Sequence, residues 1–244
     1  MLFFDFQPTA LGSPTFQEFI VRMHTTDSQA SCSADVPVTL SLQLHGLSCE
    51  RGNRQLFKDL SISLCAGDLL RVRGANGAGK TSLLRMLCSL LVPSEGYITW
   101  QGLPLAAQRS EFNHCLVYVG HAAAVKDELS PLENLLDALA LAGHPTTVPA
   151  AMRALGVAGL RGFEKTPARY LSQGQRRRSA LARLALSQHA SVWVLDEPFN
   201  ALDTAATAWL TSLIEAHLQN AGMVVLTSHQ DMPVKAARQK ELSL

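Results

Sequence analysis

Long hydrophobic runs are missing from this sequence. No segment of the 244 residues approaches the roughly 18 to 20 uncharged apolar residues that a membrane-spanning helix requires. The most apolar segment, residues 82–92, is interrupted by Arg85. Residues 1–5 also lack the basic flank and the apolar run of a secretory signal. We therefore expect a chain that neither spans a membrane itself nor is exported.

Charge of one sign and clustered cysteines are scarce as well. The 21 basic and 20 acidic residues give a formal net charge of +1, so no bulk electric field favours nucleic acid or an anionic membrane. We expect no nucleic-acid partner. The five cysteines form no CxxC pair, which argues against a zinc cage or a disulfide framework and fits a reducing cytoplasm. These cysteines are Cys32, Cys49, Cys65, Cys88 and Cys115.

Composition divides the chain into two parts. Residues 1–38 mix proline and glycine with a stretch rich in serine, threonine, aspartate and glutamine, without sustained periodicity. We expect a disordered extension there. The chain as a whole is 47% hydrophobic, and residues 39–244 are long enough to form one large α/β domain with a packed core.

Short apolar runs and turn residues predict the main elements of this domain. Apolar residues recur at helical spacing between 83 and 91, and residues 96–102 are expected to form a hairpin. Ser130 opens a capping box with Pro131 at the first helical position, which predicts a helix closed by Gly143. Continuous apolar runs bounded by polar residues are typical of strands in a buried parallel sheet. The predicted strands are residues 69–73, 116–119, 192–195 and 223–226.

Residues 74–81, with the sequence GANGAGKT, form a specific phosphate-binding motif. They satisfy GxxxxGK(S/T), in which glycines let backbone N–H groups converge on phosphate oxygens at the start of a helix. The predicted strand before the motif and the helix after it argue against an ordinary glycine-rich turn. Lys80 is expected to reach the β and γ phosphates of a nucleotide, and Thr81 to bind Mg²⁺. The expected phosphate-binding set is Gly74, Asn76, Gly77, Gly79, Lys80, Thr81 and Ser82.

Two carboxylates, Asp196 and Glu197, follow the predicted strand at residues 192–195. Such a strand end is common, and by itself it leaves a catalytic role and an ordinary strand exit about equally open. The phosphate-binding motif upstream favours the catalytic role. Asp196 is then predicted to hold Mg²⁺ through water, and Glu197 to orient the attacking water.

The segment LSQGQ, residues 171–175, lies between these motifs and precedes a helix predicted from residue 176 to about residue 187. Here the chain resembles the ABC ATPase family, in which the LSGGQ signature of one protomer covers the γ-phosphate held by the other. The resemblance implies an α/β P-loop NTPase fold with a RecA-like parallel-sheet core, an antiparallel β subdomain and a helical signature subdomain at about 122–180. It also implies a head-to-tail homodimer or pseudo-dimer that hydrolyses ATP with Mg²⁺ at two composite sites. The matching signature residues are Ser172, Gly174 and Gln175.

Two further residues are assigned by the same resemblance. Asp203 resembles the aspartate of the family's D-loop, which links the two sites across the dimer. His229 follows the last predicted strand and resembles the switch histidine that contacts the γ-phosphate. Together with Glu197 and Lys80, His229 completes the predicted catalytic set.

Three consecutive arginines follow the signature. Consecutive residues on a helix point in different directions, and the chain is nearly neutral, so a nucleic-acid contact is not favoured. We interpret them as a solvated helix face. The three are Arg176, Arg177 and Arg178.

Two departures from the family pattern narrow the resemblance. The family's adenine-stacking aromatic falls in register with Arg51, whose guanidinium would stack on the base instead. The family's Q-loop glutamine, which touches Mg²⁺ and couples to the membrane partner, falls in register with His121. With the run at residues 126–134 and the hairpin at 96–102, these features resemble the cytochrome c maturation branch of the family.

That branch implies a peripheral subunit on the cytoplasmic face of the bacterial inner membrane. Its partners would be integral permease subunits of the Ccm type, acting in haem export or in release of a haem-loaded chaperone. The ATPase subunit of another ABC exporter is the alternative. A soluble ABC ATPase without a permease is less favoured, since long coiled-coil insertions and tandem cassettes are absent. An inactive scaffold is disfavoured by the presence of Lys80, Asp196, Glu197 and His229.

Overall fold

Our computed structural model describes residues 40–228 and 234–244, which belong to one compact unit. The expected disordered extension at residues 1–38 lies outside the described residues, and so does His229.

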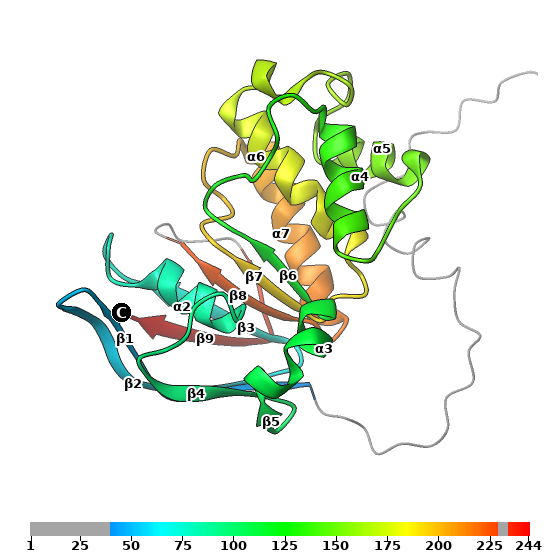
Figure 1. Cartoon of the computed structure of the whole chain (residues 1–244). Helices are drawn as coiled ribbons and strands as arrows, with labels where there is room; N and C mark the ends of the chain where they lie inside the picture. Colours follow the sequence, from blue (N-terminus) through cyan, green and yellow to red (C-terminus); the bar gives the residue numbers. More distant parts are fainter. Residues whose placement is uncertain (1–39, 229–233) are drawn as a thin grey trace, which may run out of the picture. The chain divides into compact units, whose positions relative to one another are not determined.

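Two sheets form the frame of this unit (Figure 1). The first is antiparallel, in the order β2-β1-β4-β5, and the second is parallel, in the order β6-β7-β8-β3-β9. The antiparallel strands are β1 (Ser41–Arg51), β2 (Arg54–Cys65), β4 (Glu95–Trp100) and β5 (Leu103–Pro104). The parallel strands are β3 (Asp68–Arg73), β6 (Leu116–Val119), β7 (Val192–Leu195), β8 (Met223–Thr227) and β9 (Arg238–Ser243).

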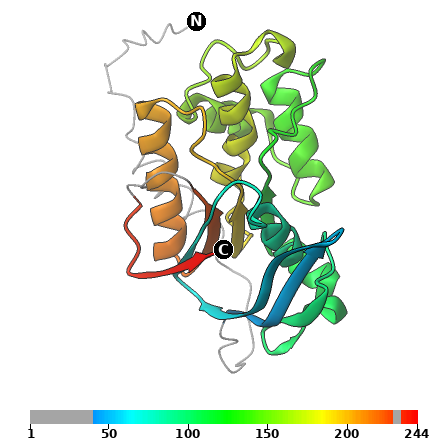
Figure 2. The same cartoon turned by 90° about the vertical axis from the view of Figure 1, so that its left-hand side faces the viewer.

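The helices are short and lie between the strands in sequence. The α-helices are α2 (Lys80–Leu87), α3 (Arg109–His114), α4 (Pro131–Leu141), α5 (Val148–Val157), α6 (Gln173–Leu181) and α7 (Thr204–Gln219). The 3₁₀ turns are η1 (Leu105–Gln108), η2 (Ala168–Tyr170) and η3 (Ala182–Leu186). The antiparallel sheet and the group α4, α5 and α6 lie at opposite ends of the unit (Figures 1 and 2). The expected combination of a parallel core, an antiparallel sheet and a helical part is therefore confirmed.

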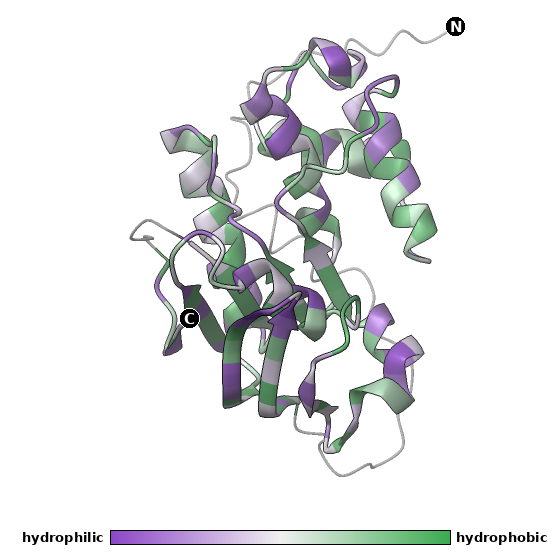
Figure 3. Cartoon of the chain, turned by 60° about the vertical axis from the view of Figure 1, so that its left-hand side comes forward, coloured by the Kyte–Doolittle hydropathy of each residue, from purple (hydrophilic) through white to green (hydrophobic). Residues whose placement is uncertain are grey.

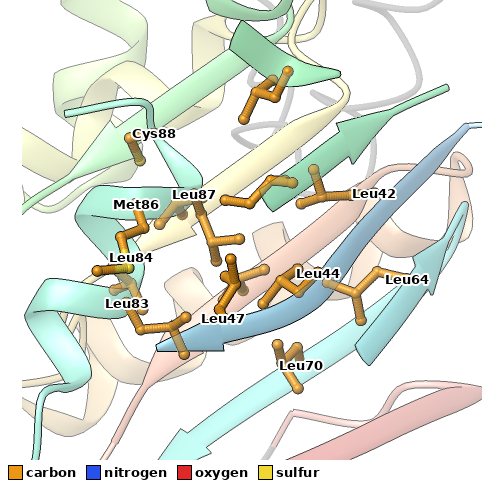
Figure 4. Close-up of a cluster of buried hydrophobic side chains, with 14 of the residues drawn as sticks. Leu42, Leu44, Leu47, Leu64, Leu70, Leu83, Leu84, Met86, Leu87 and Cys88 are labelled. Carbon is orange, nitrogen blue, oxygen red and sulfur yellow. The ribbon is translucent and has the colours of Figure 1, made fainter. Parts of the chain in front are cut away.

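One face of the parallel sheet is packed against α2 and the antiparallel sheet. A single hydrophobic cluster joins residues of β1, β2 and α2 to the parallel strands β3, β7 and β8. Figure 4 shows leucines of β1 and α2 gathered beside Leu70 of β3. Burying a leucine side chain stabilises a fold by about 1.5–3 kcal/mol, so this layer fixes the position of α2 firmly. The labelled residues are Leu42, Leu44, Leu47, Leu64, Leu70, Leu83, Leu84, Met86, Leu87 and Cys88.

The opposite face of the parallel sheet is covered by α7. Side chains alternate between the faces along a strand, and Trp193 of β7 points to the side opposite the cluster that contains Val192 and Val194. The Trp193 ring stacks on His217 of α7, with ring centroids 3.9 Å apart and an interplanar angle of 6°. The inner strands β7 and β8 are thus buried on both faces, and Figure 3 shows the centre of the sheet as hydrophobic.

The predicted strands and the capped helix are confirmed, whereas two helix limits differ. The helix after the phosphate-binding motif ends at Leu87, because the chain turns at Ser89 with a φ of 54°. The helix after the signature starts at Gln173, with Ser172 as its N-cap, and changes to the 3₁₀ turn η3 after Leu181. In the described residues no helix is long and apolar enough to cross a membrane, and the longest has 16 residues.

Candidate nucleotide-binding site

The phosphate-binding motif forms a loop between β3 and α2. Gly79 precedes the first residue of α2 and has a φ of 106°, a backbone conformation that is unfavourable for residues other than glycine. A Cβ atom at Gly79 would lie 3.0 Å from Leu56 Cβ and 3.1 Å from Phe57 Cδ1, so β2 packs directly on the loop. Lys80 is 6% exposed, and its Nζ donates hydrogen bonds to the carbonyls of Gly74 (2.7 Å) and Ala75 (3.1 Å). The loop therefore holds its own lysine at the helix start, where anions bind.

Asp196 connects this loop to the end of the parallel sheet. Its side chain is almost fully buried, and Thr81 Oγ1 donates to Asp196 Oδ2 at 2.8 Å. Thr227, the last residue of β8, donates to Asp196 Oδ1 at 2.8 Å and accepts from the backbone N–H of Glu197 at 2.7 Å. The neighbouring strands β7 and β8 end at the same edge, which brings these groups together. Thr227 is thus a member of the site to which the sequence analysis gave no role.

Glu197 adopts a left-handed backbone conformation with a φ of 48°. Its side chain is 14% exposed, and Asn200 Nδ2 donates a short hydrogen bond to Glu197 Oε2. The imidazole Nδ1 of His121 lies 3.8 Å from the same oxygen, on a side chain that is 68% exposed. Uncommon backbone conformations in non-glycine residues concentrate at functional sites. The predicted base Glu197 and His121, the residue predicted for the Q-loop position, therefore face each other.

The signature segment is organised as a helix start. Ser172 and Gln175 form a capping box, in which each backbone N–H donates to the other's side chain, at 2.8 Å and 3.2 Å. A Cβ atom at Gly174 would lie 2.7 Å from the carbonyl oxygen of Ala201. Only glycine fits there, so the signature packs against the segment that precedes Asp203.

Asp203 begins the long helix α7. Its Oδ1 accepts from the backbone N–H of Ala206 at 2.8 Å, which makes Asp203 the N-cap. Its Oδ2 lies 3.5 Å from a guanidinium nitrogen of Arg178. Asp203, which the sequence predicts as the D-loop aspartate, is therefore a helix cap in the structure, a role that the sequence analysis did not predict.

The interpretation of the three arginines as a solvated helix face is wrong for Arg177. Its residue exposure is 5%, and its guanidinium donates to backbone carbonyls at the ends of two strands. Burial lowers the pKa of Arg177, although the nearby charges of Asp196 and Glu197 act in the opposite direction. Arg177 stands four residues before the buried Leu181, and this helical spacing was the signal available in the sequence.

The other arginines next to Arg177 are only half-buried. Arg176 pairs with Asp127 at 2.8 Å and donates to the carbonyl of Ala168, while Arg178 pairs with Asp203. Each of the three arginines therefore has a different set of partners.

Arg51 is the last residue of β1. It is exposed and stands opposite Arg54 in the β1–β2 hairpin. Within the phosphate-binding set, Asn76 and Gly77 are exposed, and Ser82 is half-buried. The structure thus brings Thr81, Asp196, Glu197 and His121 together through the contacts given above, and Lys80 directly precedes Thr81 at the start of α2.

These features define a class of protein. The site has a glycine loop at the end of a parallel strand, a buried aspartate that is hydrogen-bonded to the loop threonine, and a second carboxylate beside it. This combination is typical of a P-loop ATPase. The family described as ABC transporter matches residues 57–200. The chain belongs to this ABC transporter family, and it is an ATPase.

The relatives on which this assignment rests are similar over nearly their whole length. A protein of Dechloromonas aromatica described as "Cytochrome c biogenesis ATP-binding export protein CcmA" is 49% identical, over 83% of this chain and 99% of the relative. A protein of Methylococcus capsulatus with the same description is 50% identical, over 78% of this chain and 91% of the relative. Within the ABC transporter family, the chain therefore belongs to the group of CcmA proteins.

Solved structures agree in fold. A putative ATP-binding protein of an ABC transporter from Pyrococcus furiosus has a TM-score of 0.69 at 23% identity, over 83% of this chain and 97% of that one. A dimeric ATP-binding cassette described as a post-hydrolysis state bound to ADP and Pi has a TM-score of 0.67 at 22% identity, over 78% and 88%.

Proposed function

We propose that this chain is the ATP-hydrolysing subunit of a cytochrome c maturation complex that acts in haem export or in release of a haem-loaded chaperone. The observation that carries the proposal is the 49% identity that extends over 99% of a cytochrome c biogenesis relative. The geometry supports the ATPase part independently, because the loop lysine, the buried aspartate and the second carboxylate meet at one sheet edge.

Hydrolysis needs a group that orients water towards the γ-phosphate, and Glu197 is proposed for this role. Its carboxylate is held by Asn200 and faces His121, and its backbone N–H is fixed by Thr227. Lys80 would exchange its carbonyl partners in the loop for phosphate oxygens, to which an ammonium group binds strongly. His229 is proposed as the switch histidine on the basis of its sequence position alone.

Thr81 and Asp196 are proposed to hold Mg²⁺. A hydroxyl and a carboxylate oxygen 2.8 Å apart are hard oxygen ligands, which suit this ion. When bound, Mg²⁺ would neutralise charge on the β and γ phosphates. The chemistry of these donor groups therefore fits the ion.

Two composite sites in a homodimer are proposed to complete the enzyme. Ser172, Gly174 and Gln175 would cover the γ-phosphate held by a second copy, and Asp203 would link the two sites. The proposal is supported by the start of α6, where backbone N–H groups gather at the signature. Arg51 is proposed to stack on adenine, and His121 to take the Q-loop position.

The remaining proposals concern organisation and location. Residues 39–244 are proposed as the ATPase domain, with a helical subdomain at about 122–180 and a disordered extension at 1–38. The subunit is proposed to lie on the cytoplasmic face of the bacterial inner membrane, bound to Ccm-type permease subunits. Sequence similarity to the cytochrome c biogenesis relatives supports both the partner and the location.

Glu197→Gln tests the catalytic role. We expect the turnover of Mg²⁺-ATP to fall about 100-fold or more, because removal of a general base costs 10²–10⁴ in rate, while ATP affinity stays unchanged. Turnover would be followed by phosphate release and affinity by titration of a fluorescent ATP analogue. Glu111→Gln, at an exposed position on α3, is the control and should behave like the wild type. Normal turnover in Glu197→Gln would remove the base assignment.

A complementation experiment tests the cellular role. In a strain from which the gene for this chain has been deleted, covalent haem in c-type cytochromes should be lost. The wild-type gene should restore it, and the gene for Glu197→Gln should not. Normal c-type cytochromes in the deletion strain, together with co-purification of an unrelated permease, would instead assign the subunit to another ABC exporter.

A further inference from the structure

Arg177 joins three segments of the site through one guanidinium group. Nη1 donates to the carbonyl of Gly120 at 2.8 Å and to that of His121 at 3.2 Å. Nη2 donates to the carbonyl of Asp196 at 2.7 Å and to that of Glu197 at 2.9 Å. The first pair follows β6, the second pair follows β7, and Arg177 itself belongs to the helix that starts at the signature.

The planar fork of arginine suits this arrangement. Its two terminal nitrogens are held at a fixed separation, and each of them reaches one pair of carbonyls. A carbonyl accepts a hydrogen bond from a charged donor more strongly than from a neutral one, and burial of the group strengthens such bonds further. Arg177 therefore holds the ends of β6 and β7 at a fixed distance from each other and from α6.

The backbone of Glu197 depends on this contact. Its left-handed φ of 48° is unfavourable for a side chain with a Cβ atom and persists only where the surroundings hold it. Thr227 Oγ1 accepts from the N–H of Glu197, and the C=O of Glu197 accepts from Arg177 Nη2 at 2.9 Å and from the backbone N–H of Asn200 at 3.2 Å. The direction of the carboxylate follows from the backbone conformation that these contacts hold, and Arg177 contributes the shorter, charged hydrogen bond on the C=O side.

We propose that Arg177 is a positioning residue for hydrolysis, which sets the backbone of Glu197 and transmits displacements of the signature helix to it. This inference rests on the proposed role of Glu197 as the base. Arg177 donates to no group of the phosphate loop among its four carbonyl partners, so its loss should affect the chemical step and spare ATP binding.

Two substitutions test the inference. We expect Arg177→Gln to lower kcat about 100-fold, since a misplacement of about 1 Å in a reacting group has an effect of this size, and to leave KM for ATP within about twofold of the wild type. Arg177→Lys should be impaired to a similar degree, because a single ammonium nitrogen cannot reach both pairs of carbonyls. Full rescue by lysine would show that only charge is needed and would overturn the inference.

The matched control is Arg183→Gln. Arg183 is another mostly buried arginine in the same stretch of chain, and its Nη2 donates to the carbonyl of Tyr118 at 2.8 Å, earlier on β6. The variant Arg183→Gln should lower the Tm, as Arg177→Gln should, but it should keep the wild-type kcat. ATPase rates would be measured well below the Tm of each variant. Each rate would be divided by the amount of ATP analogue that the sample binds, so that unfolded protein does not lower the kcat obtained.

The outcomes separate this inference from the proposed function. Normal kcat in Arg177→Gln, or equal losses in Arg177→Gln and Arg183→Gln, would overturn the positioning role if Glu197→Gln is inactive in the same assay. Turnover retained in Glu197→Gln would instead remove the proposed base, whatever the arginine variants do.

Discussion

Thr227→Val should destabilise the fold through one hydroxyl group. Thr227 is fully buried, and valine has nearly the same shape, so packing of β8 should be preserved. The substitution leaves Asp196 Oδ1 without one donor and the Glu197 N–H without its acceptor. A hydrogen bond to a charged group contributes about 1.5–3 kcal/mol, and an unsatisfied buried group costs about 1–3 kcal/mol. We therefore expect the free energy of unfolding to fall by about 3 kcal/mol.

The assay is urea and thermal unfolding of nucleotide-free protein, because bound nucleotide would add stability by mass action. A loss of 3 kcal/mol corresponds to a decrease in Tm of roughly 6–12 °C for a domain of this size. Thr227→Ser retains the hydroxyl and should lose only about 1 kcal/mol, for the missing methyl group. The kcat of Thr227→Val should fall as well, because the backbone N–H of Glu197 loses its acceptor.

The comparison of Thr227→Val with the wild type decides the outcome. If the free energy of unfolding of Thr227→Val lies within about 0.5 kcal/mol of the wild-type value, the hydroxyl group adds nothing beyond packing, because changes of this size are typical of neutral substitutions. The network around Asp196 would then have no part in stability.

Two other predictions concern the loop and a buried histidine. Gly79→Ala should weaken ATP binding about 10-fold or more without unfolding the protein, because the alanine Cβ atom would lie 3.0 Å from Leu56 and force the loop to shift. An unchanged Kd in an ATP-analogue titration would contradict this prediction. Burial lowers the pKa of His217 from 6.5 to about 4. Between these two pH values the unfolded chain binds a proton that the folded chain does not. The free energy of unfolding therefore falls by up to about 3 kcal/mol as the pH decreases from about 6.5 towards about 4. His217→Gln should lack this part of the pH dependence in urea unfolding, and equal slopes in both proteins would refute the assignment.

Local patterns were sufficient to predict the frame of this site. The strands at residues 116–119 and 192–195 and the capped helix at Ser130 depend on neighbours in sequence, and they appear where they were expected. The glycine loop and the two carboxylates together are specific for binding a nucleotide phosphate and Mg²⁺, so they could be recognised from the sequence. Their meeting at one sheet edge follows from the rule that parallel strands end together.

Contacts between segments that are distant in the sequence could not be predicted from local patterns. Thr227 joins the site because β8 lies beside β7, and no local pattern gives that order of strands. Arg177 looked solvated because charged residues seldom lie buried, and its backbone acceptors are 56 to 57 residues away on one strand end and 19 to 20 on the other. Backbone carbonyls leave no trace in a sequence, so a side chain that binds them is easily missed.

The close approach between Gly174 and Ala201 limits how these proteins can vary. The missing side chain at Gly174 leaves room for the carbonyl of Ala201, whose own φ is 61°. A side chain at 174 would therefore require a different path for the segment before Asp203, and two segments proposed to face a second subunit would shift together. Gln173 is exposed, so a large side chain fits at position 173 and none fits at position 174.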